Sequence, residues 1–238
     1  MIKIVTAAQR HTSNRDWIHS EFSFSFGDYD DPSNAHFGCL LAHNDNELQP
    51  MTGMKDHPHQ NLEIVSYVVS GILHHEDDLG NEAELQPGTV QVMSAGTGIR
   101  HSESNRSELG PVRFLQLWLL PARPGAEPRW DAKHFPPEFR QDTLLPVVSG
   151  SGQEGTLSVN EDVTIYLSLL GPEKELKHPL KENRRAHLFV ISGNLELDCR
   201  DGSFNLGAGD AARIRNSCDL KIKGQGEEGS EFILIDLP

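Results

Sequence analysis

The chain has 238 residues, which is enough for one large domain or two small ones with cores of their own. Its 21 Lys and Arg against 35 Asp and Glu give a formal net charge of −14, which disfavours direct binding to nucleic acid. With no apolar run near the roughly 20 residues of a membrane helix, no signal-peptide pattern and three scattered cysteines, we expect a soluble cytoplasmic protein with no membrane partner.

Short runs of β-branched and aromatic residues, alternating with polar ones, dominate the first half of the chain. They predict strands near 62–74, 82–86, 89–94, 99–104 and 111–120. Turn signals rich in Gly, Asn and Pro separate these runs, for example at 78–81 and 95–98. Because strands so closely spaced leave no room for crossover helices, the pattern indicates an antiparallel sandwich or barrel.

The second half of the chain again contains short alternating runs separated by turns, and it follows a proline-rich segment. Residues 121–142 contain five prolines, and we place a linker at 131–142, between an N-terminal domain (1–130) and a C-terminal one (143–238). Strands are predicted near 156–159, 163–170, 186–191, 194–199, 210–215 and 231–237. A strand leading to a glycine turn recurs in both halves, so the sequence predicts an all-β fold of two tandem antiparallel barrels.

Two short motifs carry the chemistry of the chain. His57 and His59 are two residues apart, as are His101 and Glu103, and residues at this spacing point to the same side of a strand. Glu63 would share the face of the first pair if its strand continued unbroken. Two antiparallel strands, each with such a pair facing a barrel interior, can supply a four-ligand metal site.

Three neutral imidazoles and one carboxylate suit a borderline divalent ion, so Fe, Mn, Co, Ni, Cu and Zn are all compatible with these motifs. A lone His-x-His pair is more often a polar surface pair than a ligand pair. The second pair, which follows a glycine-rich turn, makes metal binding the stronger interpretation.

Several longer strings of the first half resemble the pirin family of the cupin superfamily. They are FSFSFGDY at 22–29, HPH at 57–59, EIVSYVVSG at 63–71, HEDDLGN at 75–81 and MSAGTGIRHSE at 93–103. Within that family, the sequence is most similar to the short bacterial pirin-like proteins that act as quercetin 2,3-dioxygenases. The resemblance implies a bicupin with one divalent transition metal, Fe(II) being favoured, in the N-terminal barrel.

The resemblance also implies which residues bind the ion. In pirins the ligands fall on the positions of His57, His59, His101 and Glu103, whereas other cupins use the glutamate that matches Glu63. We therefore expect Glu63 near the metal but outside its ligand set. The C-terminal half has no His-x-His motif, and we expect it to form a metal-free supporting barrel.

Two classes of function follow from the resemblance. In the first, a flavonol such as quercetin binds beside the metal, Glu103 takes the proton of its 3-hydroxyl group, and dioxygen opens the ring with release of carbon monoxide. In the second, the protein is a metal-binding regulatory or interaction protein with no dedicated activity. A cupin that keeps its metal only for stability is a third, simpler interpretation.

Other polar and aromatic residues near these motifs have weaker assignments. The charged run from His74 to Asp78 could bind a second metal but is more typical of a solvated hairpin turn, although His75 could line the mouth of the site. Gln116 is either a polar group in an aromatic pocket or a solvent-facing residue. The alternating phenylalanines of 22–26 are interpreted as core.

Overall fold

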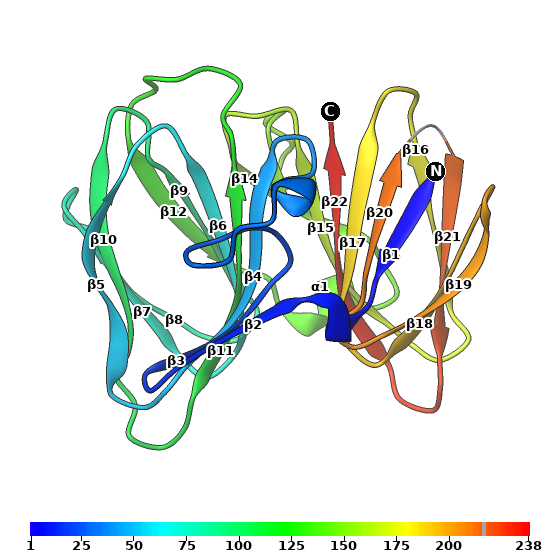
Figure 1. The fold of residues 1–238 in the computed structure, drawn as a ribbon, viewed down its shortest axis with the longest axis horizontal. Coiled ribbons are helices and arrows are strands. Elements are labelled where there is room, and N and C mark those ends of the chain that lie inside the picture. The colour runs from blue at the N-terminus through cyan, green and yellow to red at the C-terminus, as the bar shows by residue number, and fades with distance from the viewer. Residues whose placement is uncertain (216–217) are drawn as a thin grey trace. The chain divides into compact units, whose positions relative to one another are not determined.

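The computed structural model describes residues 1–215 and 218–238 and consists almost entirely of β-strands (Figure 1). Helical turns are short: η1 (Ala7–Gln9), η2 (Pro32–Asn34) and α1 (Pro137–Arg140). No helix in this described part of the chain has the length and apolar character needed to cross a membrane. The all-β class predicted from the sequence is confirmed.

The chain divides into two compact units. The N-terminal unit comprises Arg10–Phe135 with Leu157–Glu161, and the C-terminal unit comprises Met1–Gln9, Pro136–Thr156 and Asp162–Pro238. Each unit contains a large and a small antiparallel sheet, and each has buried apolar residues of its own. Burial of these apolar side chains is the dominant favourable contribution to folding.

In the N-terminal unit, a seven-stranded sheet has the order β12-β9-β6-β11-β4-β3-β2 and a four-stranded sheet has the order β5-β10-β7-β8. The strands of the larger sheet are β2 (His11–Arg15), β3 (Ile18–Phe22), β4 (Leu40–Leu48), β6 (Glu63–Ser70), β9 (Thr89–Ser94), β11 (Val112–Leu119) and β12 (Arg129–His134). Those of the smaller sheet are β5 (Thr52–His59), β7 (Leu73–Asp77), β8 (Glu82–Leu85) and β10 (Ile99–Asn105), and β14 (Leu157–Ser158) also belongs to this unit.

The two sheets of this unit share a core. Leu73 and Leu85 of the smaller sheet belong to one buried cluster with Val68 and Phe114 of the larger sheet. The single strand expected at 62–74 is two strands, because the chain changes direction at Gly71, whose φ of +75° is readily adopted only by glycine. That turn moves the chain from the larger sheet into the smaller one, which places β7 beside β10.

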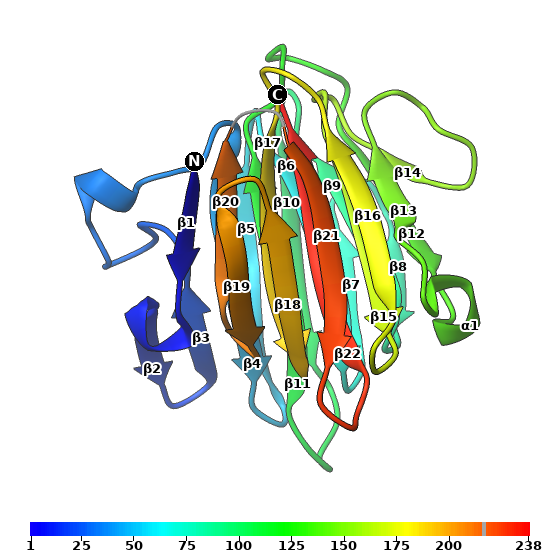
Figure 2. The same ribbon diagram turned by 90° about the vertical axis from the view of Figure 1, so that its right-hand side faces the viewer.

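The C-terminal unit repeats the plan (Figure 2). Its larger sheet has the order β1-β20-β17-β22-β15-β13, with β1 (Ile2–Val5), β13 (Leu145–Ser149), β15 (Thr164–Leu170), β17 (Arg185–Ser192), β20 (Ala211–Arg215) and β22 (Ser230–Leu237). Its smaller sheet has the order β16-β21-β18-β19, with β16 (Glu175–Leu180), β18 (Asn194–Cys199), β19 (Gly202–Gly207) and β21 (Cys218–Gln225).

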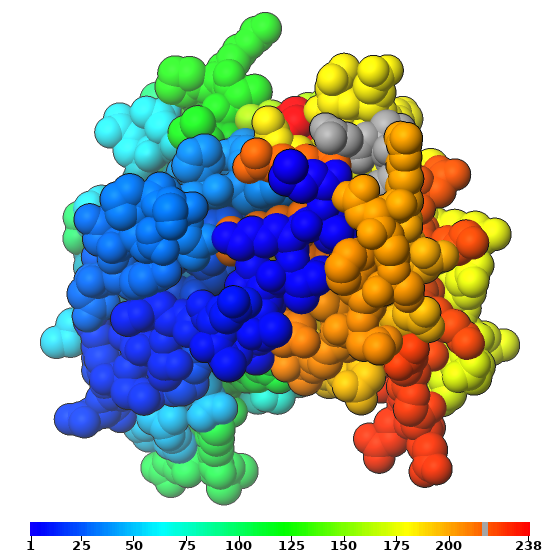
Figure 3. All heavy atoms as spheres, turned by 45° about the vertical axis from the view of Figure 1, so that its right-hand side comes forward, coloured from blue at the N-terminus to red at the C-terminus, as the bar shows by residue number. Residues whose placement is uncertain are grey.

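Two segments differ from the domain boundaries expected from the sequence. Residues 129–134, partly inside the expected linker, form β12 and pair along their length with β9, because the prolines of this region lie on either side of them. The first residues belong to the C-terminal unit, since β1 pairs with β20. Figure 3 shows this N-terminal segment, in dark blue, packed against the orange residues of that unit.

Candidate metal centre

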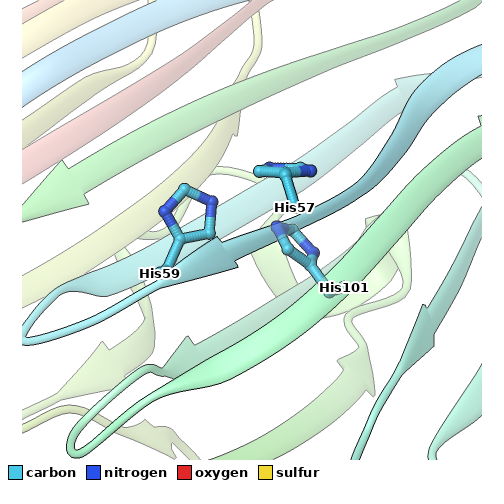
Figure 4. Close-up of side chains that lie close together, drawn as sticks. All are labelled: His57, His59 and His101. Atoms are coloured by element: carbon cyan, nitrogen blue, oxygen red, sulfur yellow. The ribbon is translucent and has the colours of Figure 1, made fainter.

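Three histidines of the smaller N-terminal sheet come together on one face. β5 and β10 are antiparallel, with His101 directly opposite His57 and Ile99 opposite His59. Because His57 and His59 are two residues apart, their side chains leave β5 on the same side as His101 leaves β10 (Figure 4). The ring centroids are 4.5 Å apart for His57 and His101, 4.8 Å for His57 and His59, and 5.1 Å for His59 and His101.

The nitrogen atoms of this cluster suit a metal ion. One ring nitrogen from each of His57, His59 and His101 lies within 4.8 Å of the others. Within the described residues, neither ring nitrogen of the buried His101 has a hydrogen-bond partner, which is an unusual cost for buried polar atoms. His57 donates from Nδ1 to the carbonyl oxygen of Lys55 at 2.7 Å, and this bond leaves Nε2 free to act as a ligand. The donor set therefore fits a divalent transition metal.

The surroundings of the cluster lower the pKa of two of its imidazoles, those of His59 and His101. Burial, together with the neighbouring His57, lowers the pKa of His59 to about 4. Burial is also the main reason why the pKa of His101 is lowered to about 2, with further contributions from His57, His59 and His75. Metal ligation requires the unprotonated imidazole, so at neutral pH these two side chains need not release a proton before they bind an ion.

Glu103 lies on β10, two residues after His101, and its side chain is fully buried. The pairing of β5 and β10 shifts between His101 and Glu103, so that Glu103 lies opposite Met54. Such a bulge re-aims the side chains next to it and is common beside functional sites. The carboxylate of Glu103 lies within 4.8 Å of ligand atoms of His101 and His75, and this second group shares His101 with the histidine cluster.

Two glutamines hold the carboxylate of Glu103. Gln91 of β9 donates from Nε2 to Oε1 at 2.5 Å, and Gln116 of β11 donates from Nε2 to Oε2 at 2.8 Å. The Oγ atom of Ser66 lies 3.5 Å from Oε1. These donors favour the ionised form, but burial outweighs them and raises the pKa of Glu103 to about 7. Gln116 thus points into the barrel beside the carboxylate and not toward solvent.

His75 lies on β7, directly opposite Glu103 of the neighbouring β10. Its side chain is completely buried and stacks on the indole of Trp130, with ring centroids 4.9 Å apart and an interplanar angle of 13°. Nε2 of His75 lies 3.1 Å from Oδ2 of Asp77. His75 thus lies inside the barrel and not at its exposed mouth, because parity along β7 directs it and Asp77 inward.

Glu63 is buried in a separate polar network. Oε2 accepts a 2.6 Å hydrogen bond from the hydroxyl of Ser94, and Oε1 accepts a 2.9 Å hydrogen bond from the amide of Asn160. Both oxygens are therefore engaged by neutral donors within the N-terminal unit. This arrangement gives Glu63 a structural role in joining residues 157–161 to the barrel.

Aromatic side chains border the histidine cluster. Trp118 packs edge-on against His59, with ring centroids 5.1 Å apart, and Phe26 packs edge-on against Trp118 at 4.8 Å. Phe24 is fully buried as expected for core, but Phe26 is only half-buried and belongs to this aromatic wall. The wall places aromatic rings beside the candidate metal ligands.

Sequence reasoning missed two residues of this site, Gln91 and Trp130, and it interpreted Asp77 as part of a solvated hairpin turn, whereas Asp77 is buried beside His75. The signal for Gln91 was a polar residue within the otherwise apolar run 90–93, where a buried amide needs a hydrogen-bond partner. Trp130 was missed because no strand was predicted in the proline-rich segment 121–142, in which β12 lies.

The paired sheets, with a histidine cluster inside the first barrel, define a two-domain cupin. Comparison with known proteins agrees: residues 5–119 match the family described as pirin, and residues 146–237 match the quercetinase C-terminal cupin domain. The chain belongs to the pirin family.

Relatives resemble this chain over nearly its full length. A quercetin 2,3-dioxygenase of Escherichia coli K12 is 33% identical over 238 residues, covering 100% of this chain and 99% of that protein. A pirin-like protein of Caulobacter vibrioides is 34% identical and covers 92% of both chains. The crystal structure of the bacterial pirin YhhW from Escherichia coli in complex with nickel(II) superposes with a TM-score of 0.92 at 32% identity, covering 100% and 99% of the two chains.

Proposed function

We propose that this protein is a metal-dependent dioxygenase that cleaves flavonols such as quercetin. The observation that carries the proposal is the placement of a buried carboxylate, Glu103, beside a cluster of three histidines that borders an aromatic wall. The names of the Escherichia coli relative and the nickel complex of YhhW support it.

The proposed metal ligands are His57, His59, His101 and Glu103. His57 and His59 are half-buried whereas His101 and Glu103 are buried, so the ligands lie between the barrel interior and its mouth. When bound, a divalent transition metal, with Fe(II) favoured, would act as a Lewis acid for the flavonol hydroxyl and would bring dioxygen near the ring. Coordination by Glu103 requires its carboxylate to turn toward the histidine cluster.

Glu103 is proposed as the general base. A positioned carboxylate whose pKa lies near the working pH can both accept and return a proton, and burial places the pKa of Glu103 at about 7 in the metal-free protein. The proton of the 3-hydroxyl group would move to a carboxylate oxygen, and the amide groups of Gln91 and Gln116 would stabilise the ionised form before transfer. A bound cation would lower this raised pKa, so that Glu103 is ionised and ready to accept the proton at neutral pH.

The aromatic wall is proposed to bind and orient the flavonol. Trp118 and Phe26 present ring surfaces beside His59, and offset or edge-to-face contacts with a planar substrate are favourable there. Stacking against Trp118 would hold the ring system above the histidine cluster and exclude water from it.

A turnover assay tests this function. The protein is stripped of metal under anaerobic conditions and reconstituted with each divalent ion in turn; quercetin loss, dioxygen consumption and carbon monoxide release are then measured together. We expect all three to proceed in a 1:1:1 ratio with at least one ion. Tight metal binding without turnover for any ion would contradict the proposal and favour a metal-binding regulatory protein.

A further inference from the structure

The outer face of the β7–β8 hairpin gathers one histidine and three glutamates. His74 and Glu76 alternate with the inward-pointing His75, so they lie on the opposite side of β7. In the antiparallel register His74 is directly opposite Glu84, and Glu76 is directly opposite Glu82. The hairpin therefore presents two cross-strand pairs on the face away from the barrel interior.

His74 is buried in spite of this position. It is only 4% exposed, and within the described residues neither of its ring nitrogens has a hydrogen-bond partner. Nε2 lies 3.3 Å from Oε1 of Glu82 without forming a hydrogen bond to it, so a buried ring nitrogen stands beside a carboxylate that does not satisfy it. Burial, reinforced by the charge of Arg106, lowers the pKa of His74 and leaves its imidazole neutral at pH 7.

The carboxylates around His74 repel one another. Like charges directly opposite each other across a strand pair are destabilising, and Glu76 and Glu82 are such a pair. Arg106 offsets this repulsion: its Nη2 lies 3.6 Å from Oε2 of Glu76, and its Nη1 lies 3.3 Å from Oε1 of Glu82. All three of these side chains are more than half exposed, so Arg106 can leave and the carboxylates can close on an ion.

We propose that His74, Glu76 and Glu82 form a second divalent metal site, independent of the dioxygenase centre. Their ligand atoms already lie within 4.8 Å of one another. One neutral imidazole with two carboxylates is a ligand set for Zn²⁺ and similar borderline ions. The ion would replace Arg106 as the positive charge between Glu76 and Glu82, and it would give His74 the partner that burial otherwise denies it.

Zinc titration of the full chain tests the proposal. Metal-free protein is titrated with Zn²⁺ by calorimetry, and ions retained per chain are counted by elemental analysis. We expect two ions per chain in the wild type. His101→Ala should leave the outer ion in place, whereas His74→Gln and Glu82→Gln should weaken it by on the order of tenfold or more, as expected when a ligand is lost.

Two further variants make the test specific. Glu108→Gln removes an exposed carboxylate outside the cluster and should leave both ions unchanged. Arg106→Gln removes the competing cation and should tighten the outer ion. A single ion that is lost with His101→Ala would overturn the proposal, as would a second ion that survives both His74→Gln and Glu82→Gln. Because the count of ions is the readout, absence of quercetin turnover does not affect the result.

Discussion

Gln116 donates from Nε2 to Oε2 of Glu103 at 2.8 Å, and a second hydrogen bond, from Trp118 to the same amide, fixes which end of Gln116 faces the carboxylate. Trp118 donates its indole N–H to Oε1 of Gln116 at 3.2 Å, and Trp130 donates in the same way to Oε1 of Gln91 at 2.8 Å. An indole nitrogen can only donate, so each glutamine must present its NH₂ group to the carboxylate. Both amides are therefore oriented to favour an ionised Glu103.

Replacing Glu103 by Gln should abolish most of the proposed activity. If Glu103 is the base, turnover falls by on the order of 10²–10⁴, the usual contribution of a positioned proton acceptor. The variant should keep much of its metal because an amide oxygen still coordinates weakly. Quercetin turnover and metal content are measured on the same preparation.

Glu63→Gln is the matched control for that change. Glu63 is as buried as Glu103, but its oxygens accept from Ser94 and Asn160, so the variant should affect stability more than chemistry. The reverse pattern, with Glu63→Gln losing its metal and Glu103→Gln nearly normal, would assign the ligand role to Glu63.

Trp130→Phe tests whether the indoles orient the base. The ring stacked on His75 is retained in this variant, but Gln91 loses the donor that fixes its amide. Donation from Gln91 lowers the pKa of Glu103, so its loss should move the acid limb of the pH–rate profile to higher pH. We expect kcat to fall by about tenfold, the rate equivalent of one hydrogen bond, with little change in KM.

Trp17→Phe provides the control, since Trp17 packs in the apolar core of the same unit. It should leave both kcat and the pH profile unchanged. An equal response of the two variants would mean that Trp130 acts only through general stability.

The proposed metal ligands can be tested directly. His59→Ala and His101→Ala each remove one imidazole from the cluster, and each should reduce bound metal at the inner site to near zero. The control is His36→Ala, which removes an exposed histidine whose Nδ1 contacts only its own turn at Gly38. Metal content is measured by elemental analysis, and an unchanged content in both cluster variants would refute the ligand assignment.

The sequence predicted the histidine cluster because every second side chain of a β-strand points to the same side of the sheet. His57, His59 and His101 follow from that parity once the two strands are paired. Parity also placed Glu103 on the same face, but it could not reveal the bulge that sets Glu103 apart from His57 and His59. A bulge depends on how two strands meet, and a single strand pattern does not encode it.

The hydrogen-bond partners of Glu103 could not be predicted from the sequence for a similar reason, because they lie on distant strands. Gln91 and Gln116 reach Glu103 across the space between two sheets, and Trp130 arrives from a strand between two proline-rich segments. Local pattern indicates that a polar residue is buried. Its partner is determined by tertiary packing.

The pH dependence of stability should reveal the buried carboxyl group in the metal-free protein. Burial raises the pKa of Glu103 from its usual 4.5 to about 7 in the folded state. The folded chain then holds a proton that the unfolded chain has released, so this contribution is fully present below pH 4.5 and is lost as pH rises through 7. A shift of this size corresponds to about 3 kcal/mol.

Comparison with Glu103→Gln isolates this contribution. The lowered pKa values of His59 and His101 act in the opposite sense, because stability is lost as pH falls from 6.5 toward 4 and 2, but they are present in both proteins.

The free energy of unfolding of each metal-free protein is measured in denaturant between pH 5 and pH 8. We expect the wild type to lose stability relative to the variant as pH rises, and we expect added metal to remove the effect, because a cation favours the ionised carboxylate. A difference that stays constant across this range would mean that Glu103 is already ionised at pH 5 and is not the near-neutral base proposed for the reaction.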